Sequence, residues 1–377
     1  MSTGMQTKDD VLRIDAMKLL GIYQEVARAH GADAEEQRIF ADCLLRADLR
    51  GHPTQGVALL PYMDELFEAG TMHFGRPLEV VRESPSMAVL DGHGGSGHVI
   101  ATRTMEKAIG KARDTGVGFV TVRNSGDCGM MSNYPLQAAE EKMIGVAMTT
   151  GPLLVAPWGG REVKFSTNPI SIAVPAGEHD PIVIDMATSA ESMGMVVLAA
   201  RDGKRLPAAT VVDAEGHYTD DPTRVILNPM DRESRMSGAL LPAGPKSFGM
   251  VLMVEMLAAL LSGERKWDDG CCPAAEGTDR SDLKRSRDAY YAQSFLALSV
   301  EFFQPLQEFL AASDRMIMDL TTTPPARGFE RVRLHDQGAG KLEHEYRSLG
   351  VPVRREEWAM VERTLARLRS KAGDLPR

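Results

Sequence analysis

The chain has 377 residues, of which 43% are hydrophobic and 25% charged, and its formal net charge at pH 7 is −9. This composition is typical of a globular protein with a sizeable core, and the length allows one large domain or two to three small ones. The acidic balance argues against a nucleic-acid partner, because phosphate binding needs clustered Lys and Arg. It does not argue against a dinucleotide, which needs only a local site.

Cysteine usage and apolar segments bear on the compartment. The four cysteines show no zinc spacing, which predicts a reducing compartment and no metal site. Residues 1–10 are polar and lack the apolar core of a signal peptide. The longest apolar stretch, Phe248–Leu261, is too short to cross a bilayer and predicts a buried helix. We therefore expect a cytoplasmic protein with no membrane partner.

Hydrophobic periodicity predicts helices near both ends of the chain and short strands, separated by helices, in its centre. The expected helices are 13–30, 34–47, 57–67, 99–115, 132–142, 249–262, 304–320 and 355–370. The expected strands are 87–91, 117–123, 144–148, 170–174, 181–186 and 295–299. The polar segment 264–287, which contains Gly and Pro, predicts a mobile loop.

A glycine-rich stretch, Gly92–Gly97, fits the G-x-G-x-x-G pattern between an expected strand and an expected helix. A Rossmann site would also place an acidic residue at the end of the second strand, to bind the ribose. Here that strand ends at Val122-Arg123-Asn124. The missing acid favours a plain glycine turn over a Rossmann dinucleotide site.

The stretch Asp48–Val57, which reads Asp-Leu-Arg-Gly-His-Pro-Thr-Gln-Gly-Val, resembles a motif of the malate/L-lactate/sulfolactate dehydrogenase family. That family is unrelated to the Rossmann-type malate and lactate dehydrogenases, and its motif reads Asp-Leu-Arg-Gly, two variable residues, then Ser-His-Gly-Val. Further blocks occur in the family's order over nearly the whole chain. They are Asp91–Gly97, Asn124-Ser125 with Gly129, Ala156–Gly160, Thr167–Ile170, Asp185–Ser189, Asp213–Gly216, Pro242–Gly249 and Pro324-Pro325.

The resemblance implies an α/β, non-Rossmann, malate/L-sulfolactate dehydrogenase-like fold, with a mixed, largely antiparallel central sheet and helical N- and C-terminal parts. Residues 1–80 and 305–377 would form one helical dimerisation domain, and residues 81–304 the α/β domain that binds cofactor and substrate. It also implies a homodimer in which NAD or NADP and a small carboxylate substrate share a cleft near the subunit interface.

Individual site residues follow from the same resemblance. Arg50 and His52 would bind the substrate, since a guanidinium holds a carboxylate at two points. For Arg50 the alternative is an intersubunit salt bridge. The cofactor would be held by Asp185, Met186, Ala187, Lys246, Gly151 and Ser125. For the loop after Asp185 the alternative is a plain turn, and for Lys246 it is a solvated surface lysine.

The chain departs from the family where a proton donor is expected. Thr54 and Gln55 replace the Ser-His pair, and Asp127 stands where the family has its second histidine, the residue generally regarded as the acid/base. Gln55 has no titratable proton, and Asp127 is an acid near neutrality only if burial raises its pKa. The expected catalytic residues are therefore Asp127, Gln55 and Thr54, with His52 and His98 as candidate replacements for the lost histidines. A third departure is His335-Asp336-Gln337, where the family tends to have Pro-Gly-Glu.

Three functions are compatible with these residues. The first is an NAD(P)H-dependent oxidoreductase that acts on a 2-oxo acid, a 2-hydroxy acid or a cyclic imino acid. A protonated imine would need hydride and little else, and an anionic Asp127 would stabilise it. The second is a lyase or isomerase that uses the same cleft, with Asp127 as general base. The third is a non-catalytic family member.

Overall fold

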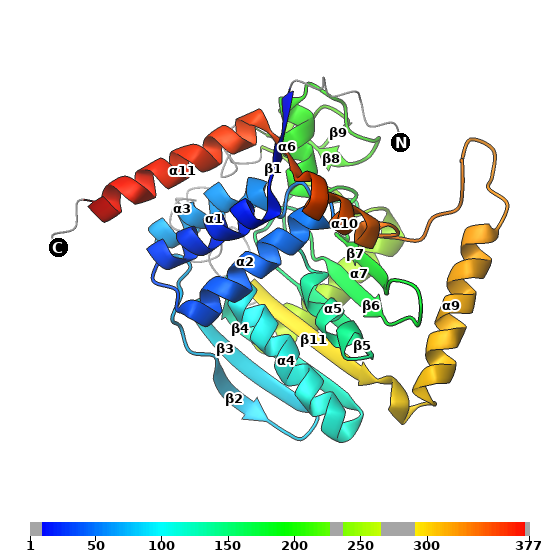
Figure 1. Ribbon diagram of the computed structural model, residues 1–377. Coiled ribbons are helices and arrows are strands. Elements are labelled where there is room, and N and C mark those ends of the chain that lie inside the picture. Colours follow the sequence, from blue (N-terminus) through cyan, green and yellow to red (C-terminus); the bar gives the residue numbers. More distant parts are fainter. Residues whose placement is uncertain (1–9, 227–236, 265–290, 374–377) are drawn as a thin grey trace.

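The computed structural model describes residues 10–226, 237–264 and 291–373, with side chains to residue 371. Its centre is a seven-stranded sheet with strand order β2-β3-β4-β11-β5-β6-β7 (Figure 1). The strands are β2 (Glu79–Glu83), β3 (Met87–Gly95), β4 (Val117–Ser125), β5 (Met143–Thr149), β6 (Ile170–Val174), β7 (Ile182–Met186) and β11 (Tyr291–Ser299).

Only β3 and β4 are parallel in this sheet; every other neighbouring pair is antiparallel. The α-helix α4 (Gly97–Thr115) makes the crossover between the two parallel strands. This arrangement confirms the predicted mixed, largely antiparallel sheet. The expected segment 264–287 falls almost wholly outside the described residues, and β11 begins at Tyr291 rather than at residue 295.

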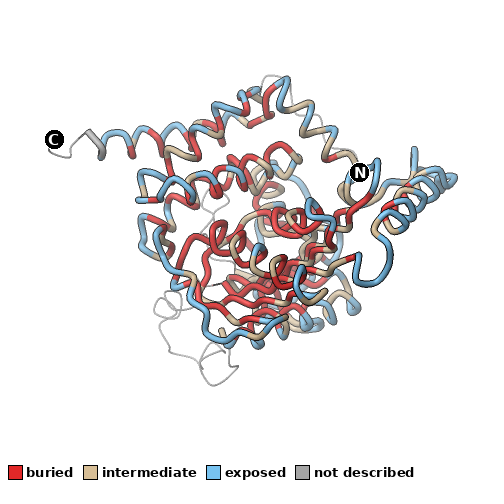
Figure 2. The backbone as a smooth tube through the Cα atoms, turned by 60° about the horizontal axis from the view of Figure 1, so that its bottom comes forward, coloured by how far each residue is buried: buried red, intermediate tan, exposed pale blue. Residues whose placement is uncertain are grey.

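Helices cover both faces of the sheet (Figure 1). On one face lie α4 and α5 (Asn133–Glu140). On the other lies α7 (Pro245–Val254), which continues as a π-helical segment, η4 (Glu255–Leu260). The Ser294 hydroxyl of β11 donates a hydrogen bond to the Leu257 carbonyl of η4. Figure 2 shows the buried residues gathered where the helices meet the strands.

The prediction that residues 249–262 form a buried helix is wrong for one side of that helix. Val251, Val254 and Glu255 are buried, but Met253 and Met256 are 52% and 53% exposed. The segment is apolar on all sides, so its sequence gives no polar face from which the exposed side could be read. One side packs on the sheet, and the described part of the chain leaves the other uncovered.

The two ends of the chain meet in a second, helical core. Its helices are α1 (Ala16–Ala29), α2 (Ala34–Leu49), α3 (Leu60–Glu68, after the 3-10 turn η2, Val57–Leu59) and α11 (Arg355–Gly373). Strand β1 (Val11–Ile14) pairs with β12 (Val351–Arg354), which joins the first described residues to the last helix. Asp33 caps α2 in a capping box with Glu36, and this explains where that helix begins.

The remaining elements surround these two cores. They are α6 (Met193–Arg201), η3 (Pro222–Arg224), α10 (Ala339–Leu349), η5 (Val300–Phe302) and a small sheet of β8 (Val211–Val212), β9 (Tyr218–Thr219) and β10 (Ala239–Leu240). Helix α9 (Leu306–Thr322) projects from the body (Figure 1) and contributes no residue to the helical core. Asp314 of α9 accepts hydrogen bonds from the backbone N–H groups of Gly177 and Glu178 in the β6–β7 turn.

The predicted domain boundaries stay a prediction. Within the described residues, no helix is long and apolar enough to cross a membrane.

Candidate functional site

Asp48 organises the loop that follows α2. Its carboxylate accepts hydrogen bonds from the Tyr23 hydroxyl and, at 2.9 Å, from the backbone N–H of Val57. Gly56 leaves room for it, since a Cβ at that position would lie 1.9 Å from Asp48 Oδ1. Burial raises the pKa of Asp48 to about 7. Within the Asp-Leu-Arg-Gly block, Asp48 therefore has a structural role. It holds the loop that carries Arg50 and His52.

Arg50 lies largely buried against a segment from the other end of the chain. Its Nη2 donates a hydrogen bond to the carboxylate of Asp336, and their side chains are 12% and 10% exposed. His52 Nε2 lies 3.9 Å from Asp336 Oδ1. The acidic partner that was the alternative for Arg50 thus exists, but within the same chain. The buried Nε of Arg50 has no hydrogen-bond partner among the described residues.

Asp185 joins the same charged cluster. At the end of β7, it accepts a 2.7 Å hydrogen bond from the backbone N–H of Ser132. Burial raises the pKa of Asp185, nearby His52 opposes that shift, and the charge of Asp336 adds to it. Arg50, His52, Asp185 and Asp336 therefore form one charged group, built from the loop after α2, the end of β7 and the segment before α10.

The segment after Asp185, which begins with the partly buried Met186 and Ala187, contacts the N-terminus of α7. The Thr188 carbonyl accepts a hydrogen bond from the backbone N–H of Ala243, at 3.3 Å, and another from the Ser247 hydroxyl. Lys246 is the second residue of α7, is exposed, and forms no ion pair with a described residue. The first N–H groups of a helix attract anions, so Lys246 and this helix end suit a phosphate group.

Asp127 belongs to a second cluster, under the start of β11. Its Oδ1 accepts a 2.8 Å hydrogen bond from the Gly129 N–H, and its Oδ2 accepts a 3.3 Å hydrogen bond from the Tyr291 hydroxyl. Tyr291 also bonds Tyr62 of α3, and burial together with the charge of Asp127 raises its pKa well above the usual value. The Tyr291 ring packs on Gly151, where a Cβ would lie 2.6 Å from it.

Ser125 lies beside this second cluster. It is fully buried at the end of β4, and its hydroxyl lies 3.3 Å from Gln293 Oε1, while the Gln293 amide donates to the Gly126 carbonyl. These two hydrogen bonds of Gln293 therefore connect the backbone next to Asp127 to strand β11. Loop 126–132 links the two clusters, because Asp127 lies near one end and the Ser132 N–H that binds Asp185 at the other.

Thr54 and Gln55 lie in the loop between α2 and η2. Thr54 packs on Gly194 at the start of α6, where a Cβ would lie 3.0 Å from Thr54 Cβ. Gln55 is partly buried, and its backbone N–H donates to the His52 carbonyl at 3.1 Å. Their catalytic roles stay predictions.

His98, a candidate replacement for a lost histidine, lies in the interior. It is fully buried in α4 with its ring 5.2 Å from that of Phe40, and a Cβ on Gly129 would lie 2.7 Å from its Nε2. Neither ring nitrogen has a hydrogen-bond partner among the described residues. Burial lowers the pKa of His98 to about 3. The imidazole is therefore neutral near pH 7 and packs beneath the loop that carries Asp127.

Sequence reasoning missed the partners more than the site residues themselves. Tyr62 and Tyr291 gave no pattern of their own, although Tyr291 is the first residue of strand β11. Asp336 was noted only as part of a departure from Pro-Gly-Glu. Its pairing with Arg50 joins residues 286 positions apart, and a single sequence carries no signal for such a contact.

Comparison with known proteins agrees with the fold and the blocks described above. The malate dehydrogenase of Pyrococcus horikoshii is 35% identical over 360 residues, which are 92% of this chain and 93% of that protein. Its solved structure covers 98% of this chain with a TM-score of 0.82 and 30% identity. The L-sulfolactate dehydrogenase of Methanocaldococcus jannaschii is 32% identical, with 81% of this chain and 83% of that protein covered. The Delta(1)-pyrroline-2-carboxylate/Delta(1)-piperideine-2-carboxylate reductase of Pseudomonas putida is 32% identical, with 67% and 72% covered.

These relatives are dehydrogenases and a reductase, so the class that the fold defines is an oxidoreductase. A sequence model of the malate/L-lactate dehydrogenase family matches residues 14–362. The chain belongs to the malate/L-lactate dehydrogenase family, as its motifs predicted.

Proposed function

We propose that the chain is an NAD(P)H-dependent oxidoreductase that reduces a small carboxylate-bearing substrate, with cyclic imino acids favoured over 2-oxo acids. The observation that carries this proposal is the buried guanidinium of Arg50, whose Nε still lacks a partner among the described residues. A carboxylate that reached Arg50 would fill that donor. The Pseudomonas putida relative, which is named as a reductase of two cyclic imino acids, supports this substrate class.

The cofactor site is proposed at the loop after β7 and the start of α7. The bound nicotinamide cofactor would supply the hydride. Lys246 and the first N–H groups of α7 suit its phosphates, and the small residue Ala187 lets the loop backbone come close to a ligand. Gly151 and Ser125, beside Tyr291 and Gln293, would lie against the same ligand on the side of Asp127. NAD and NADP fit these residues equally well.

Asp127 favours an imine over a ketone. Both of its carboxylate oxygens accept hydrogen bonds, from Gly129 and Tyr291, and an ionised carboxylate is an acceptor only. A ketone needs a proton for the alkoxide that forms, and Asp127 in this setting acts as an acceptor. A protonated imine brings its own proton, and a nearby carboxylate stabilises its positive nitrogen. Arg50 would hold the substrate carboxylate while Asp127 faces the nitrogen.

The test has two steps. Titration with NADH and with NADPH, followed by tryptophan fluorescence, shows whether the cofactor binds. Assays with piperideine-2-carboxylate, pyrroline-2-carboxylate and 2-oxo acids then compare the wild type with Asp127→Asn. We expect turnover with the imines and its loss in the variant. Failure to bind either nicotinamide cofactor would refute the proposal and leave the non-catalytic alternative, whereas turnover of a substrate without cofactor would indicate the lyase or isomerase.

We further propose that the protein is a homodimer joined through the uncovered side of α7 and η4, in place of the helical domain of residues 1–80 and 305–377 that the family resemblance implied. Met253, Met256 and Leu260 lie at helical spacing and are exposed, and a contiguous exposed apolar stripe is typical of an interface. Light scattering after gel filtration should give the mass of two chains. Met256→Lys should shift the protein to monomer, whereas Met17→Lys, at a position on α1 that is 65% exposed against 53% for Met256, should leave it dimeric.

A further inference from the structure

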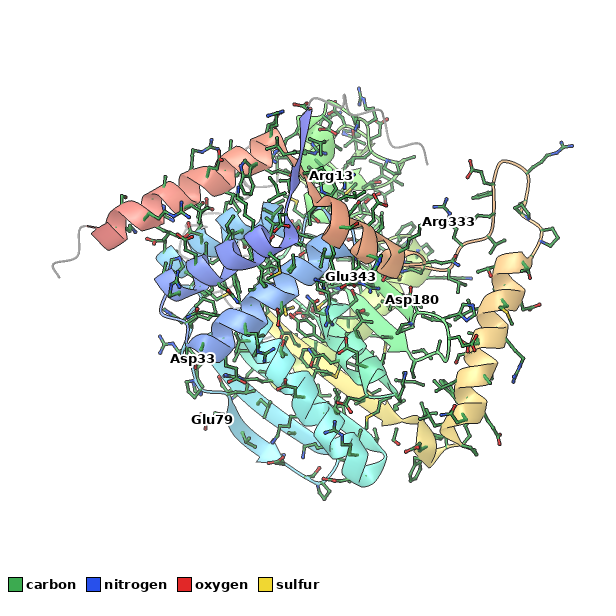
Figure 3. The ribbon with its side chains drawn as sticks, viewed as in Figure 1. Arg13, Asp33, Glu79, Asp180, Arg333 and Glu343 are labelled. Carbon is green, nitrogen blue, oxygen red and sulfur yellow. The ribbon has the colours of Figure 1, made fainter. Side chains whose placement is uncertain are left out.

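The segment between α9 and α10 reaches the interior at Asp336. Its neighbours His335 and Gln337 are exposed, whereas the Asp336 side chain is 10% exposed. The segment is fixed just beyond this point, because α10 begins against the β6–β7 turn. A Cβ on Gly340 would lie 2.4 Å from Asp180 Oδ2, and Figure 3 shows Asp180 beside the start of α10. The contact at Gly340 thus fixes the chain four residues after Asp336, and the hydrogen bond from Arg50 holds Asp336 itself.

The backbone of Asp336 indicates that this placement has a cost. Its φ is 55°, in the left-handed region, which is strained for a residue with a Cβ but not for glycine. The chain therefore places a carboxylate at a position whose geometry suits glycine, and that carboxylate contacts Arg50.

The pairing between Arg50 and Asp336 is incomplete. Only Nη2 of the guanidinium donates to Asp336, and the buried Nε is without a partner among the described residues. An arginine fork usually offers two parallel N–H groups to one carboxylate. Asp336 occupies one part of a position that the carboxylate of a small ligand would fill more fully.

Two acidic side chains belong to this cluster. Asp336 contacts Arg50 directly, and Asp185 is close enough that the charge of Asp336 raises its pKa. The second negative charge of a dianionic ligand would be repelled by these carboxylates. In a ligand with one carboxylate and a positive nitrogen, the nitrogen would instead be attracted to them. Coulomb energies between charges a few ångströms apart in a partly buried site are large enough to discriminate between such ligands.

We propose that Asp336 is a specificity-determining residue that competes with the substrate carboxylate for Arg50 and discriminates against dianionic acids. This inference rests on the proposed role of Arg50 in binding a substrate carboxylate. It narrows the substrate class to monocarboxylates that carry a positive nitrogen. The carboxylate of such a ligand displaces Asp336 from Arg50. Asp336 and Asp185 then balance the charge of the ligand's positive nitrogen.

The experiment is a calorimetric titration of the full chain with oxalate, a dianion, and with L-proline, a zwitterionic cyclic amino acid. Asp336→Gly removes the carboxylate and suits the left-handed backbone, and Asp336→Asn removes the charge while keeping the shape. We expect both variants to bind oxalate at least 10-fold more tightly than the wild type, with a change of less than 3-fold for L-proline. The added substitution Arg50→Gln should abolish the gain. Asp202→Asn, which breaks a 2.9 Å ion pair with Arg354 elsewhere, should leave oxalate affinity unchanged.

Unchanged or weaker oxalate binding by Asp336→Gly, or an equal gain for both ligands, would overturn this inference. The titrations need no nicotinamide cofactor, so they can be read separately from the proposed function. A selective oxalate gain in a protein that binds neither NADH nor NADPH would support the role of Asp336 and refute the reductase.

Discussion

The Arg50 cluster and the Asp127 cluster differ in how the chain holds their charges. Arg50 depends on Asp336, which is 286 residues away in sequence and belongs to an otherwise exposed segment. Asp127 is held by the Gly129 N–H two residues away and by Tyr291 at the start of a central strand. The first cluster is a long-range ion pair whose partner can be exchanged. The second is a turn fixed to the sheet, so we expect perturbations there to act mainly through geometry.

The largest effect is expected for Arg50→Gln. Loss of one partner of a buried, hydrogen-bonded charge pair costs about 2–5 kcal/mol, so kcat/KM for the imino acid should fall about 30-fold or more. Arg50→Lys should retain part of the activity because it keeps the charge but not the fork. Steady-state kinetics measure both, with nicotinamide binding as the control. A loss below 10-fold for Arg50→Gln would contradict a role in substrate binding.

Asp48→Asn tests the scaffold beneath Arg50. The pKa of Asp48 is raised in the folded state from 3.8 to about 7, so the native protein favours the protonated form. Wild-type stability should therefore fall as the pH rises from about 4 to about 7, by up to roughly 4 kcal/mol relative to a neutral side chain. Asparagine keeps an acceptor for the Val57 N–H and has no such dependence. Urea unfolding at pH 5 and pH 8 should show that the free energy of unfolding of the variant rises relative to that of the wild type at pH 8. The same pH dependence in both proteins would contradict the raised pKa of Asp48.

Gly97→Ala tests the geometry beneath Asp127. A Cβ on Gly97 would lie 2.2 Å from the Gly126 carbonyl oxygen and 2.3 Å from that of Asp127, so the loop must move. We expect a loss of about 1–3 kcal/mol in the free energy of unfolding, together with reduced turnover. Gly110→Ala, in the same helix with no atom within 4 Å of its Cβ, should instead gain about 0.5–1 kcal/mol. Equal effects from the two substitutions would show that crowding at the loop is not the cause.

Tyr291→Phe should have the smallest effect. It removes the hydroxyl that bonds Tyr62 and that donates a 3.3 Å hydrogen bond to Asp127, while the Gly129 N–H remains, and a net hydrogen bond to a charged group contributes about 1.5–3 kcal/mol at most. We expect kcat to fall by about 10-fold with KM little changed. A fall as large as that of Asp127→Asn would mean that Tyr291 itself contacts the substrate.

The fold was predictable where local patterns and recurring blocks coincided. Strands such as β5 and β6 are short β-rich runs bounded by turn residues, and the family blocks placed them in one sheet. The exposed side of α7 was not predictable, because an apolar segment without a polar face reads as buried. The short elements α10 and β12 were missed for other reasons: α10 has few apolar residues, and β12 is only four residues long.

Within the site, the sequence named Arg50, Asp127 and Asp185 but not what holds them. Arg50 and Asp185 come together only because the loop after α2 and the end of β7 are folded against each other. Asp336 had already appeared as a departure from the family, yet its contact depends on the path of the segment between α9 and α10. Residue types indicate chemistry, whereas partners depend on packing between distant segments.

The pairing of β1 with β12 has a consequence for biosynthesis. The buried side chains of α1 and α2, including Tyr23 and Phe40, share one core with Trp358 and Leu365 of α11. A nascent chain presents the first set long before α11 leaves the ribosome, so this core closes only after α11 has emerged. We expect a chain that ends at residue 350 to expose this surface and bind hydrophobic dyes, as a stalled intermediate would.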